Sequence, residues 1–351
     1  MSDLWRLVEA VTLARLDEHI EDIDITFDGR TAAIASVSGQ VALLDLMAAS
    51  GASGVEVGLR IVHTHAAEAV RARWSPNGSV LATGSNDGSV ALLRRDGSVI
   101  AEARSRGWCG DLEWAPDGSS LAVAFGREVI RLSPDGTEQQ RHGPHPTTVT
   151  SLAWRHDGTQ LAVSAGGNVW WYADGPEPVR LLEGAGAVIV LAVSPDDRWI
   201  AVGNQDASIH CWELREDGDE LAMSGFAGKV TTLSWTPDAT LLAVGNLGRV
   251  SVWDFTGNGP KGAAPRDLLG HAGRTNTVAF QPHSTLADPT LATCGDDGLV
   301  RLWTPDRTRS TADSEATSAD RPVVLRWLPD GTGLIVGCAD GTVQRVDVVS
   351  P

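Results

Sequence analysis

The sequence has no stretch of about 18 uncharged apolar residues, and this absence excludes a helix that crosses a membrane. Its opening, MSDLWRLVEAVTLARLDEH, also lacks a basic segment followed by an apolar one, so a secretory signal peptide is not expected. We therefore expect a cytoplasmic protein that makes no membrane contact.

Cysteine is scarce. The four cysteines are scattered along the chain, with no close pair and no metal-type spacing: Cys109, Cys211, Cys294 and Cys338. Such a distribution argues against a disulfide framework and against a cysteine metal site. We expect reduced thiols in the core.

Basic residues are outnumbered, 28 against 45 acidic ones, which gives a net charge of −17. This excess of negative charge repels nucleic acid and anionic lipid, so neither is expected as the main partner. Only Lys229 and Lys261 are lysines. The preference for arginine indicates a GC-rich bacterial genome and carries no functional weight.

A repeated phrase fills the rest of the chain. A short strand ends in an aromatic or apolar anchor, a turn of the Ser-Pro-Asp-Gly type follows, and then come a Leu-Ala-Val strand and a strand that often ends in Trp. The eight anchors lie 39 to 47 residues apart: Phe27, Trp74, Trp114, Trp154, Val193, Trp235, Phe280 and Trp327. A period near 40 with strand-only content predicts an all-β propeller.

We predict one domain over residues 1–351, with eight four-stranded antiparallel blades. Val8 to Leu13 is expected to pair beside Thr342 to Val348, because an N-terminal strand that completes the last blade leaves no exposed sheet edge. Residues 306–321 are polar with no apolar strand. They predict a weak or missing outer strand in blade seven and a disordered segment, for which a regulatory role is an alternative.

Repeat seven carries a specific signature: Gly270-His271, then TVAF, then LATCGDDGLVRLW ending at Trp303. In this it resembles the WD-repeat family of β-propellers, although the other repeats are degenerate and eight blades exceed the family's commoner seven. The resemblance implies a hydrogen-bonded network of His271, Thr293, Asp297 and Trp303 inside one blade. These residues would satisfy buried polar groups and would be structural, not catalytic.

No Ser-His-Asp order, nucleophile elbow or phosphate-binding loop occurs, so neither an enzyme nor a cofactor is expected. His63 and His65, and His142 and His145, have spacings that can bind zinc or copper. His65, His145 and His271 all lie nine residues before their anchors, however, which is the family's structural histidine position. That leaves His63 and His142 unexplained, two blades apart, and metal binding stays an alternative.

Charged residues occur one and three positions before the anchors, on the strand expected to line the channel: Asp24, Arg71, Arg73, Asp111, Glu113 and Arg326. Their sign alternates from blade eight through blade three. We interpret them as ion pairs between blades. The alternative is a polarised channel wall that holds an anion or a partner's acidic side chain.

Six positions before the anchors, a predicted rim is acidic on one side, aromatic at one point and basic on the other. Its notable members are Glu21, Glu68, Trp108, Lys229, Arg274 and Arg321. An exposed Trp beside charges is typical of an interaction hot spot. The sequence therefore predicts a non-enzymatic, monomeric platform for a protein or peptide. The alternative function is binding of a metal or small ligand by the histidine pairs or the channel arginines.

Overall fold

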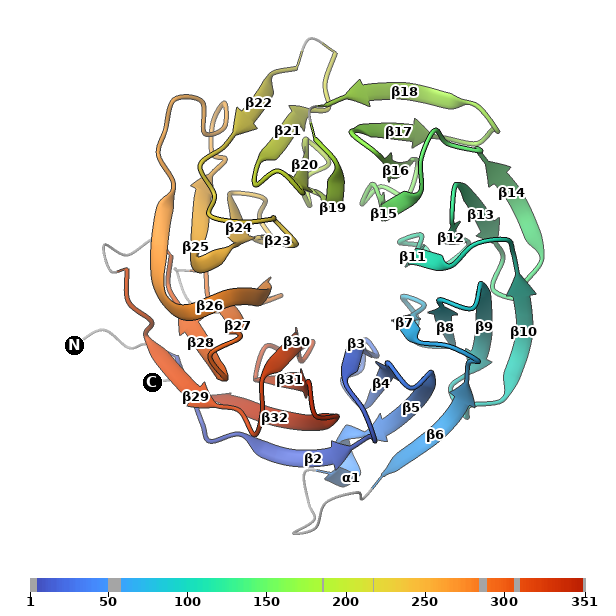
Figure 1. The fold of residues 1–351 in the computed structure, drawn as a ribbon, viewed down its shortest axis with the longest axis horizontal. Helices are drawn as coiled ribbons and strands as arrows, with labels where there is room; N and C mark the ends of the chain where they lie inside the picture. The colour runs from blue at the N-terminus through green and yellow to red at the C-terminus, as the bar shows by residue number, and fades with distance from the viewer. Residues whose placement is uncertain are drawn as a thin grey trace.

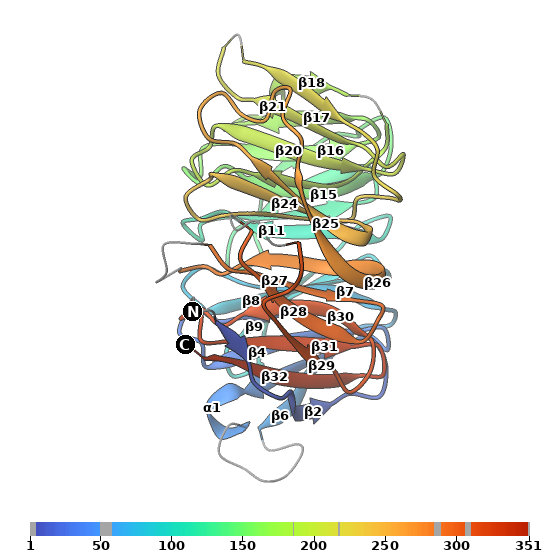
Figure 2. The same cartoon turned by 90° about the vertical axis from the view of Figure 1, so that its left-hand side faces the viewer.

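The computed structural model describes residues 5–49, 58–184, 186–216, 218–283, 289–305 and 310–349. These residues form a closed ring of eight antiparallel blades around a central channel (Figure 1). Seen edge-on, the ring is a disc whose strands cross its thickness (Figure 2). Consecutive strands pair within each blade, and the innermost strand of every blade lines the channel.

From the channel outward, blade one contains β3 Ile20–Ile25, β4 Thr31–Ser36, β5 Gln40–Asp45 and β6 Leu59–Thr64. Blade two contains β7 Ala69–Trp74, β8 Val80–Ser85, β9 Ser89–Arg94 and β10 Val99–Arg104. Blade three contains β11 Cys109–Trp114, β12 Leu121–Phe125, β13 Glu128–Leu132 and β14 Glu138–His142. Blade four contains β15 Val149–Trp154, β16 Leu161–Ala165, β17 Asn168–Tyr172 and β18 Pro178–Glu183.

Blade five contains β19 Val188–Val193, β20 Trp199–Asn204, β21 Ile209–Glu213 and β22 Glu220–Met223. Blades six and seven share the long strand β26 Arg266–Phe280. The other strands of blade six are β23 Thr232–Trp235, β24 Leu241–Gly245 and β25 Leu247–Asp254. Those of blade seven are β27 Leu291–Gly295, β28 Leu299–Trp303 and β29 Ser314–Thr317. Blade eight contains β30 Pro322–Trp327, β31 Gly333–Cys338 and β32 Thr342–Val349, together with β1 Arg6–Leu7 and β2 Val11–Arg15. The one helix of the described residues is the single turn α1 Leu46–Ala49, so none of them forms a helix long enough to span a bilayer.

The turn after each inner strand explains the repeated sequence phrase. In blade two, the carbonyl of Ser75 accepts the N–H of Gly78 at 2.7 Å, and the side chain of Asn77 accepts the N–H of Ser79 at 3.0 Å. Gly78 has a φ of +67°, a conformation that favours glycine. Small polar residues followed by glycine therefore reverse the chain at this point.

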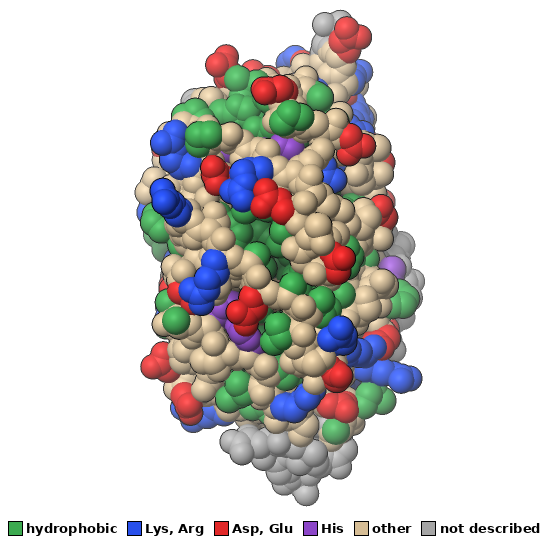
Figure 3. Space-filling model, turned by 90° about the vertical axis from the view of Figure 1, so that its right-hand side faces the viewer, with side chains coloured by type: hydrophobic (Ala, Val, Ile, Leu, Met, Phe, Trp, Pro, Cys, Tyr) green, Lys and Arg blue, Asp and Glu red, His purple; other side chains and the backbone are tan. Residues whose placement is uncertain are grey.

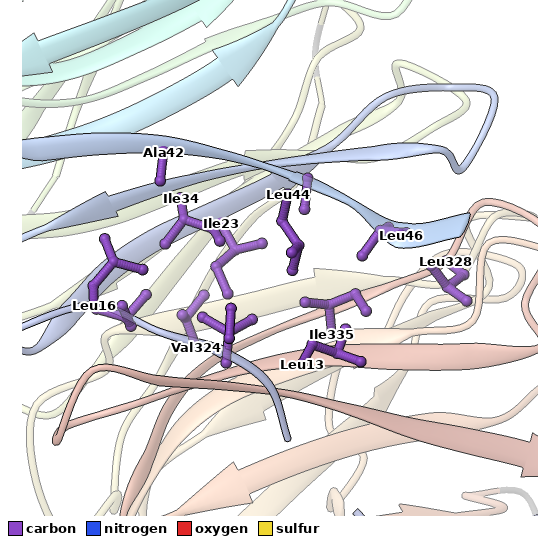
Figure 4. Packing of buried hydrophobic residues seen from close by; sticks show 14 residues of the cluster. Leu13, Leu16, Ile23, Ile34, Ala42, Leu44, Leu46, Val324, Leu328 and Ile335 are labelled. Carbon is purple, nitrogen blue, oxygen red and sulfur yellow. The ribbon is translucent and has the colours of Figure 1, made fainter. Parts of the chain in front are cut away.

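The N-terminal strand closes the ring, as predicted. Val11 lies opposite Arg345 and Arg15 opposite Thr342, while the two-residue strand β1 continues along β32. Leu13 and Leu16 pack into the core between blade one and blade eight, beside Ile23 and Ile335 (Figure 4). The two strands span Arg6–Leu7 and Val11–Arg15, so the pairing extends beyond both ends of the predicted Val8 to Leu13, and Val8 donates its N–H to the carbonyl of Asp347 at 2.9 Å.

The prediction for blade seven was wrong. Its outer strand is present: Thr317 lies opposite Leu299 and Ser314 opposite Leu302. An outer strand draws its stability mainly from backbone hydrogen bonds, and here Ala316 is the side chain that is buried. A polar sequence suffices for such a strand. Of the segment predicted to be disordered, residues 306–309 lie outside the described residues.

The first anchor was also placed wrongly. Phe27 lies in a turn with 79% of its surface exposed, and Ile25 ends the inner strand. Ile25 is the equivalent of Trp74, because the N–H of the next residue bonds across the turn in both blades: Thr26 to Thr31, and Ser75 to Val80. The register of blade one therefore shifts by two residues relative to the predicted one.

Candidate functional site

The four residues of the predicted blade-seven network lie together. His271 bonds through Nδ1 to Asp297 at 2.9 Å and through Nε2 to the Thr293 hydroxyl at 2.8 Å. The Trp303 indole N–H donates to the same hydroxyl at 2.8 Å, and Arg301 donates to Asp297 at 2.7 Å. Burial would raise the pKa of Asp297, but the hydrogen bonds from Arg301 and His271 outweigh it and lower the pKa to about 2.

The other repeat-equivalent histidines also have internal partners. His65 bonds to the hydroxyls of Ser89 at 2.8 Å and Thr83 at 3.2 Å. Burial lowers its pKa to about 4, so this imidazole is neutral at pH 7. His145 bonds to the Tyr172 hydroxyl at 3.0 Å.

The two remaining histidines of the pairs, His63 and His142, lie on different outer strands. The ring of His63 is 4.5 Å from that of His65, and the buried ring of His142 is 4.1 Å from that of Tyr172. Within the described part of the chain, no group of three or more His, Cys, Asp or Glu side chains is placed to hold a metal ion. The four cysteines are buried and free.

Anchor tryptophans hold neighbouring blades together. The indole N–H of Trp114 donates to the carbonyl of Arg73 at 3.1 Å, and that of Trp154 to the carbonyl of Glu113 at 3.2 Å. Trp235 and Trp327 make the same contact with the blade before them. Each acceptor stands one residue before the previous anchor. The recurring aromatic residue is therefore an inter-blade contact at the end of the channel.

Asp22 is the centre of the charged channel wall, and the sequence analysis did not identify it. Its carboxylate accepts a hydrogen bond from Arg73 of blade two and another, at 3.1 Å, from Arg326 of blade eight. It also accepts the backbone N–H of Ala72 at 3.2 Å. The residue is 3% exposed. These bonds outweigh the effect of burial and lower its pKa.

Two other predicted channel residues form the second inter-blade pair. Arg71 donates to Asp111 at 3.1 Å, and the second carboxylate oxygen of Asp111 accepts the N–H of Leu152 in blade four at 2.9 Å. The carboxylates of Asp22 and Asp111 thus each accept a backbone N–H from the inner strand of the next blade, in addition to their guanidinium hydrogen bonds. The alternating charges of blades eight, one, two and three form a network of ion pairs between blades.

Asp24 and Glu113 accept no guanidinium hydrogen bond from the described residues. Asp24 accepts the backbone N–H of Trp74 at 2.7 Å, and the nearest guanidinium nitrogen to Glu113 is Nε of Arg73 at 3.8 Å. Burial raises the pKa of Asp24, and it raises that of Glu113 to about 7. These two acids therefore lack the compensation that Asp22 has.

The opposite half of the channel wall is built from small residues. At the position one before the anchor, blades four to seven carry Ala153, Ala192, Ser234 and Ala279. The channel is consequently charged on one side and open on the other. Two hollows result, of about 630 Å³ and about 370 Å³.

The predicted rim surrounds the face of the disc from which the chain enters the inner strands; we call it the entry face. Its residues are defined by one backbone contact: the carbonyls of Glu68, Trp108 and Arg274 each accept an N–H from the turn after the second strand. His19 makes this contact in blade one. The prediction of Glu21 at this position was wrong, for the same reason as the Phe27 anchor.

The aromatic and basic residues of the predicted rim lie at the surface. Trp108 is 52% exposed, and Lys229, Arg274 and Arg321 are exposed. Arg321 approaches Asp296 at 3.5 Å. On the acidic side, Glu21 lies one step into the channel next to Glu68. Burial and this second acid raise the pKa of Glu21 to about 7. A proton shared between them would relieve the repulsion.

Two family models match parts of this chain. The family model described as "WD domain, G-beta repeat" matches residues 176–213, 221–254 and 264–304, and that described as "Anaphase-promoting complex subunit 4 WD40 domain" matches residues 72–143. The chain belongs to the WD-repeat family. The degenerate blades outside these ranges keep the WD-repeat architecture with fewer of its sequence marks.

Individual WD-repeat relatives are distant. Protein hir1 of Schizosaccharomyces pombe is 23% identical over 80% of this chain and 30% of its own length. Protein transport protein SEC13 of Mycosarcoma maydis is 25% identical, covering 93% of this chain and 88% of SEC13. The chain spans less than two thirds of the length of the first curated relatives found.

Among solved structures, Sqt1 from Chaetomium thermophilum is similar over 98% of this chain and 100% of its own, with a TM-score of 0.81 and 20% identity. A second Sqt1 structure, with a TM-score of 0.79, is bound to the N-terminus of the ribosomal protein L10. At this identity the likeness shows the WD-repeat fold alone.

The sequence analysis did not identify Asp22 in the channel or His19 at the rim, although the turn sequence of blade one indicates both positions. The turn Thr26-Phe-Asp-Gly29 aligns with Ser75-Pro-Asn-Gly78. Aligning the turns instead of the nearest aromatic residue places Ile25 at the anchor, and His19, Asp22 and Asp24 at the rim and channel positions.

Proposed function

We propose that this chain is a non-enzymatic platform that binds a protein or peptide on its entry face. The observation that carries the proposal is Trp108, a large aromatic side chain that is 52% exposed between oppositely charged parts of one rim. Tryptophan and arginine are enriched at interaction hot spots, where burial of a tryptophan ring supplies affinity.

The charges of the rim are arranged with acidic and basic residues on different sides of the entry face. Glu68 lies one blade away from Trp108, while Lys229, Arg274 and Arg321 occupy the basic part of the ring. Such a rim favours a partner with complementary segments of both signs and fixes its orientation on the disc. The rigid inner strands beneath keep the rim residues in fixed relative positions.

A protein of similar fold offers a precedent for this kind of function. The Sqt1 structure with the L10 N-terminus shows that a propeller of this fold can bind a peptide from another protein. For this chain we propose a partner of the same general kind, a protein segment, and no cofactor.

The rest of the surface suits a protein partner, and we propose a cytoplasmic location. Figure 3 shows acidic and basic side chains interspersed at the outer edge of the ring, with hydrophobic groups between them. With a net charge of −17, a nucleic acid or anionic membrane is a poor match. We propose that the propeller works as a monomer, because its terminal strand pairs within its own chain.

The proposal is tested by immobilising the protein, capturing its partners from an extract of the source organism, and identifying them by mass spectrometry. The double variant Trp108→Ala, Arg274→Ala should lose a partner that the native protein retains in stoichiometric amount, with an unchanged melting temperature. Phe27→Ala is the control, since Phe27 is an aromatic residue outside the rim that is even more exposed than Trp108, 79% against 52%. Equal capture by the double variant would refute the proposed rim site, as would loss of the partner by the control.

A further inference from the structure

A second hollow lies on the other face of the disc, where the inner strands end; we call this the exit face and the hollow the exit cavity. The cavity measures about 630 Å³. Three anchor tryptophans, Trp74, Trp114 and Trp154, form one wall with the prolines of the adjoining turns, Pro76 and Pro116. Small residues of blades four and five complete it.

The floor of the exit cavity carries an uneven set of charges. Its charged residues are Asp24, Arg73, Glu113 and Arg326. Both guanidiniums are committed to Asp22, deeper in the channel, through the two oxygens of its carboxylate. The third channel arginine, Arg71, is committed to Asp111. No guanidinium hydrogen bond to Asp24 or Glu113 occurs among the described residues.

Glu113 is the accessible member of the two uncompensated acids. Its side chain is 41% exposed, and its shortest contact with a cation is the 3.8 Å approach to Arg73. Burial against the apolar walls raises the pKa of Glu113, and its nearest cationic neighbour, Arg73, offsets this only in part because Arg73 hydrogen-bonds to Asp22. A cation placed beside it would remove that penalty.

We propose that the exit cavity binds the positively charged side chain of a lysine or arginine from a partner peptide, with the cationic group on Glu113 and the methylene stem along the tryptophan and proline wall. Long basic side chains pair an apolar stem with a charged head, and the cavity offers the matching surfaces in that order. The site goes beyond the proposed function, since it lies on the opposite face from Trp108 and shares no residue with the entry-face rim.

An anionic guest fits less well. It would have to compete with Asp22 for Arg73 and Arg326, and it would lie against Glu113 and Asp24. Breaking an existing buried ion pair costs more than filling an uncompensated site. Charge complementarity therefore selects a cation.

Titration of the native protein with Nα-acetyl-arginine methylamide and Nα-acetyl-lysine methylamide tests the site, followed through the indole N–H signals of ¹⁵N-tryptophan-labelled protein. At least one of the two should shift a subset of indole signals saturably. The uncharged citrulline analogue and Nα-acetyl-aspartate methylamide should not. Saturable binding of the citrulline or aspartate probe, or no binding of either cation, would overturn the proposal.

Glu113→Gln should weaken the cation about tenfold or more, because it removes the charge while keeping the shape. Glu68→Gln is the matched control on the entry face and should bind as the native protein does. Equal affinity in Glu113→Gln would overturn the assignment. Partner capture through Trp108 is measured separately, so a failure here leaves the entry-face proposal standing, and the reverse also holds.

The pH dependence gives a readout in the native protein that does not require a variant to fold. The charged groups around Glu113 are Arg73, Arg326, Asp24 and Asp111, and His156 also lines the cavity. With the Glu113 pKa at about 7, cation affinity should fall about tenfold from pH 8 to pH 6 as the carboxylate takes up a proton. The same fall should persist in His156→Gln; affinity that does not change with pH would overturn the role of Glu113.

Discussion

Asp22 and Asp24 lie two residues apart on the same inner strand, and the structure predicts opposite results for the same substitution. Asp22 accepts bonds from two guanidiniums, whereas Asp24 accepts one backbone N–H, that of Trp74. In Asp22→Asn, the new side chain could accept from one arginine but would turn its amide N–H₂ toward the other, and an amide N–H₂ cannot accept. In Asp24→Asn, the amide oxygen can still accept the N–H of Trp74.

The magnitude follows from the burial of the three groups at Asp22. Removing one member of a buried ion pair costs about 3 to 5 kcal/mol. We take the lower end, about 3 kcal/mol, because the Arg326 side chain is 33% exposed and partly screened. An unfolding entropy of about 2.1 cal/mol/K per residue gives about 0.7 kcal/mol/K for the whole chain. Asp22→Asn should therefore lower the melting temperature by about 4 °C, and Asp24→Asn should not lower it.

The two variants should also differ in their response to pH. The pKa of Asp22 is lowered in the folded state, so its contribution is complete above its ordinary value of 3.8 and is lost as pH falls through the folded pKa. The pKa of Asp24 is raised, so the native protein loses stability as pH rises from 3.8 through the folded pKa. Asp24→Asn should gain relative to the native protein over that window.

Differential scanning calorimetry at pH 7, with urea unfolding followed by tryptophan fluorescence from about pH 2 to about pH 8, measures both effects. The native protein and the two single variants are compared in one buffer series. Equal destabilisation by Asp22→Asn and Asp24→Asn would show that the guanidinium pairing of Asp22 is not what distinguishes them, and the account of the channel would have to be abandoned.

Two further predictions concern the repeat network and the closure of the ring. Asp297→Ala should destabilise by about 1 to 3 kcal/mol, because His271 and Arg301 lose a buried acceptor; an unchanged urea midpoint would argue against the network. Deletion of residues 1–14 removes β1 and most of β2 and exposes the edge of β32, so solubility or unfolding cooperativity should fall. A melting curve that matches the native one would contradict the closure.

The ring architecture was predictable because the physical cause is local and repeated. A unit of about 40 residues with short β-rich strands and glycine turns cannot bury its own faces, so it must stack against copies of itself. The N-terminal strand followed from the same reasoning, since blade eight would otherwise end at an open edge. The outer strand of blade seven did not follow, because backbone pairing of Ser314–Thr317 leaves little trace in side-chain hydrophobicity.

The number of blades, the closure of the ring and most of the positions at which charges line the channel could be worked out from the order of residues. The pairing of those charges could not, because it depends on the three-dimensional arrangement. Asp22 meets Arg326 across 304 residues of chain, and no pattern along the sequence encodes which of two nearby carboxylates will receive both guanidiniums. The sequence period identifies contacts that recur in every blade. The partners of a single side chain such as Asp22 depend instead on where the first and last blades meet in space.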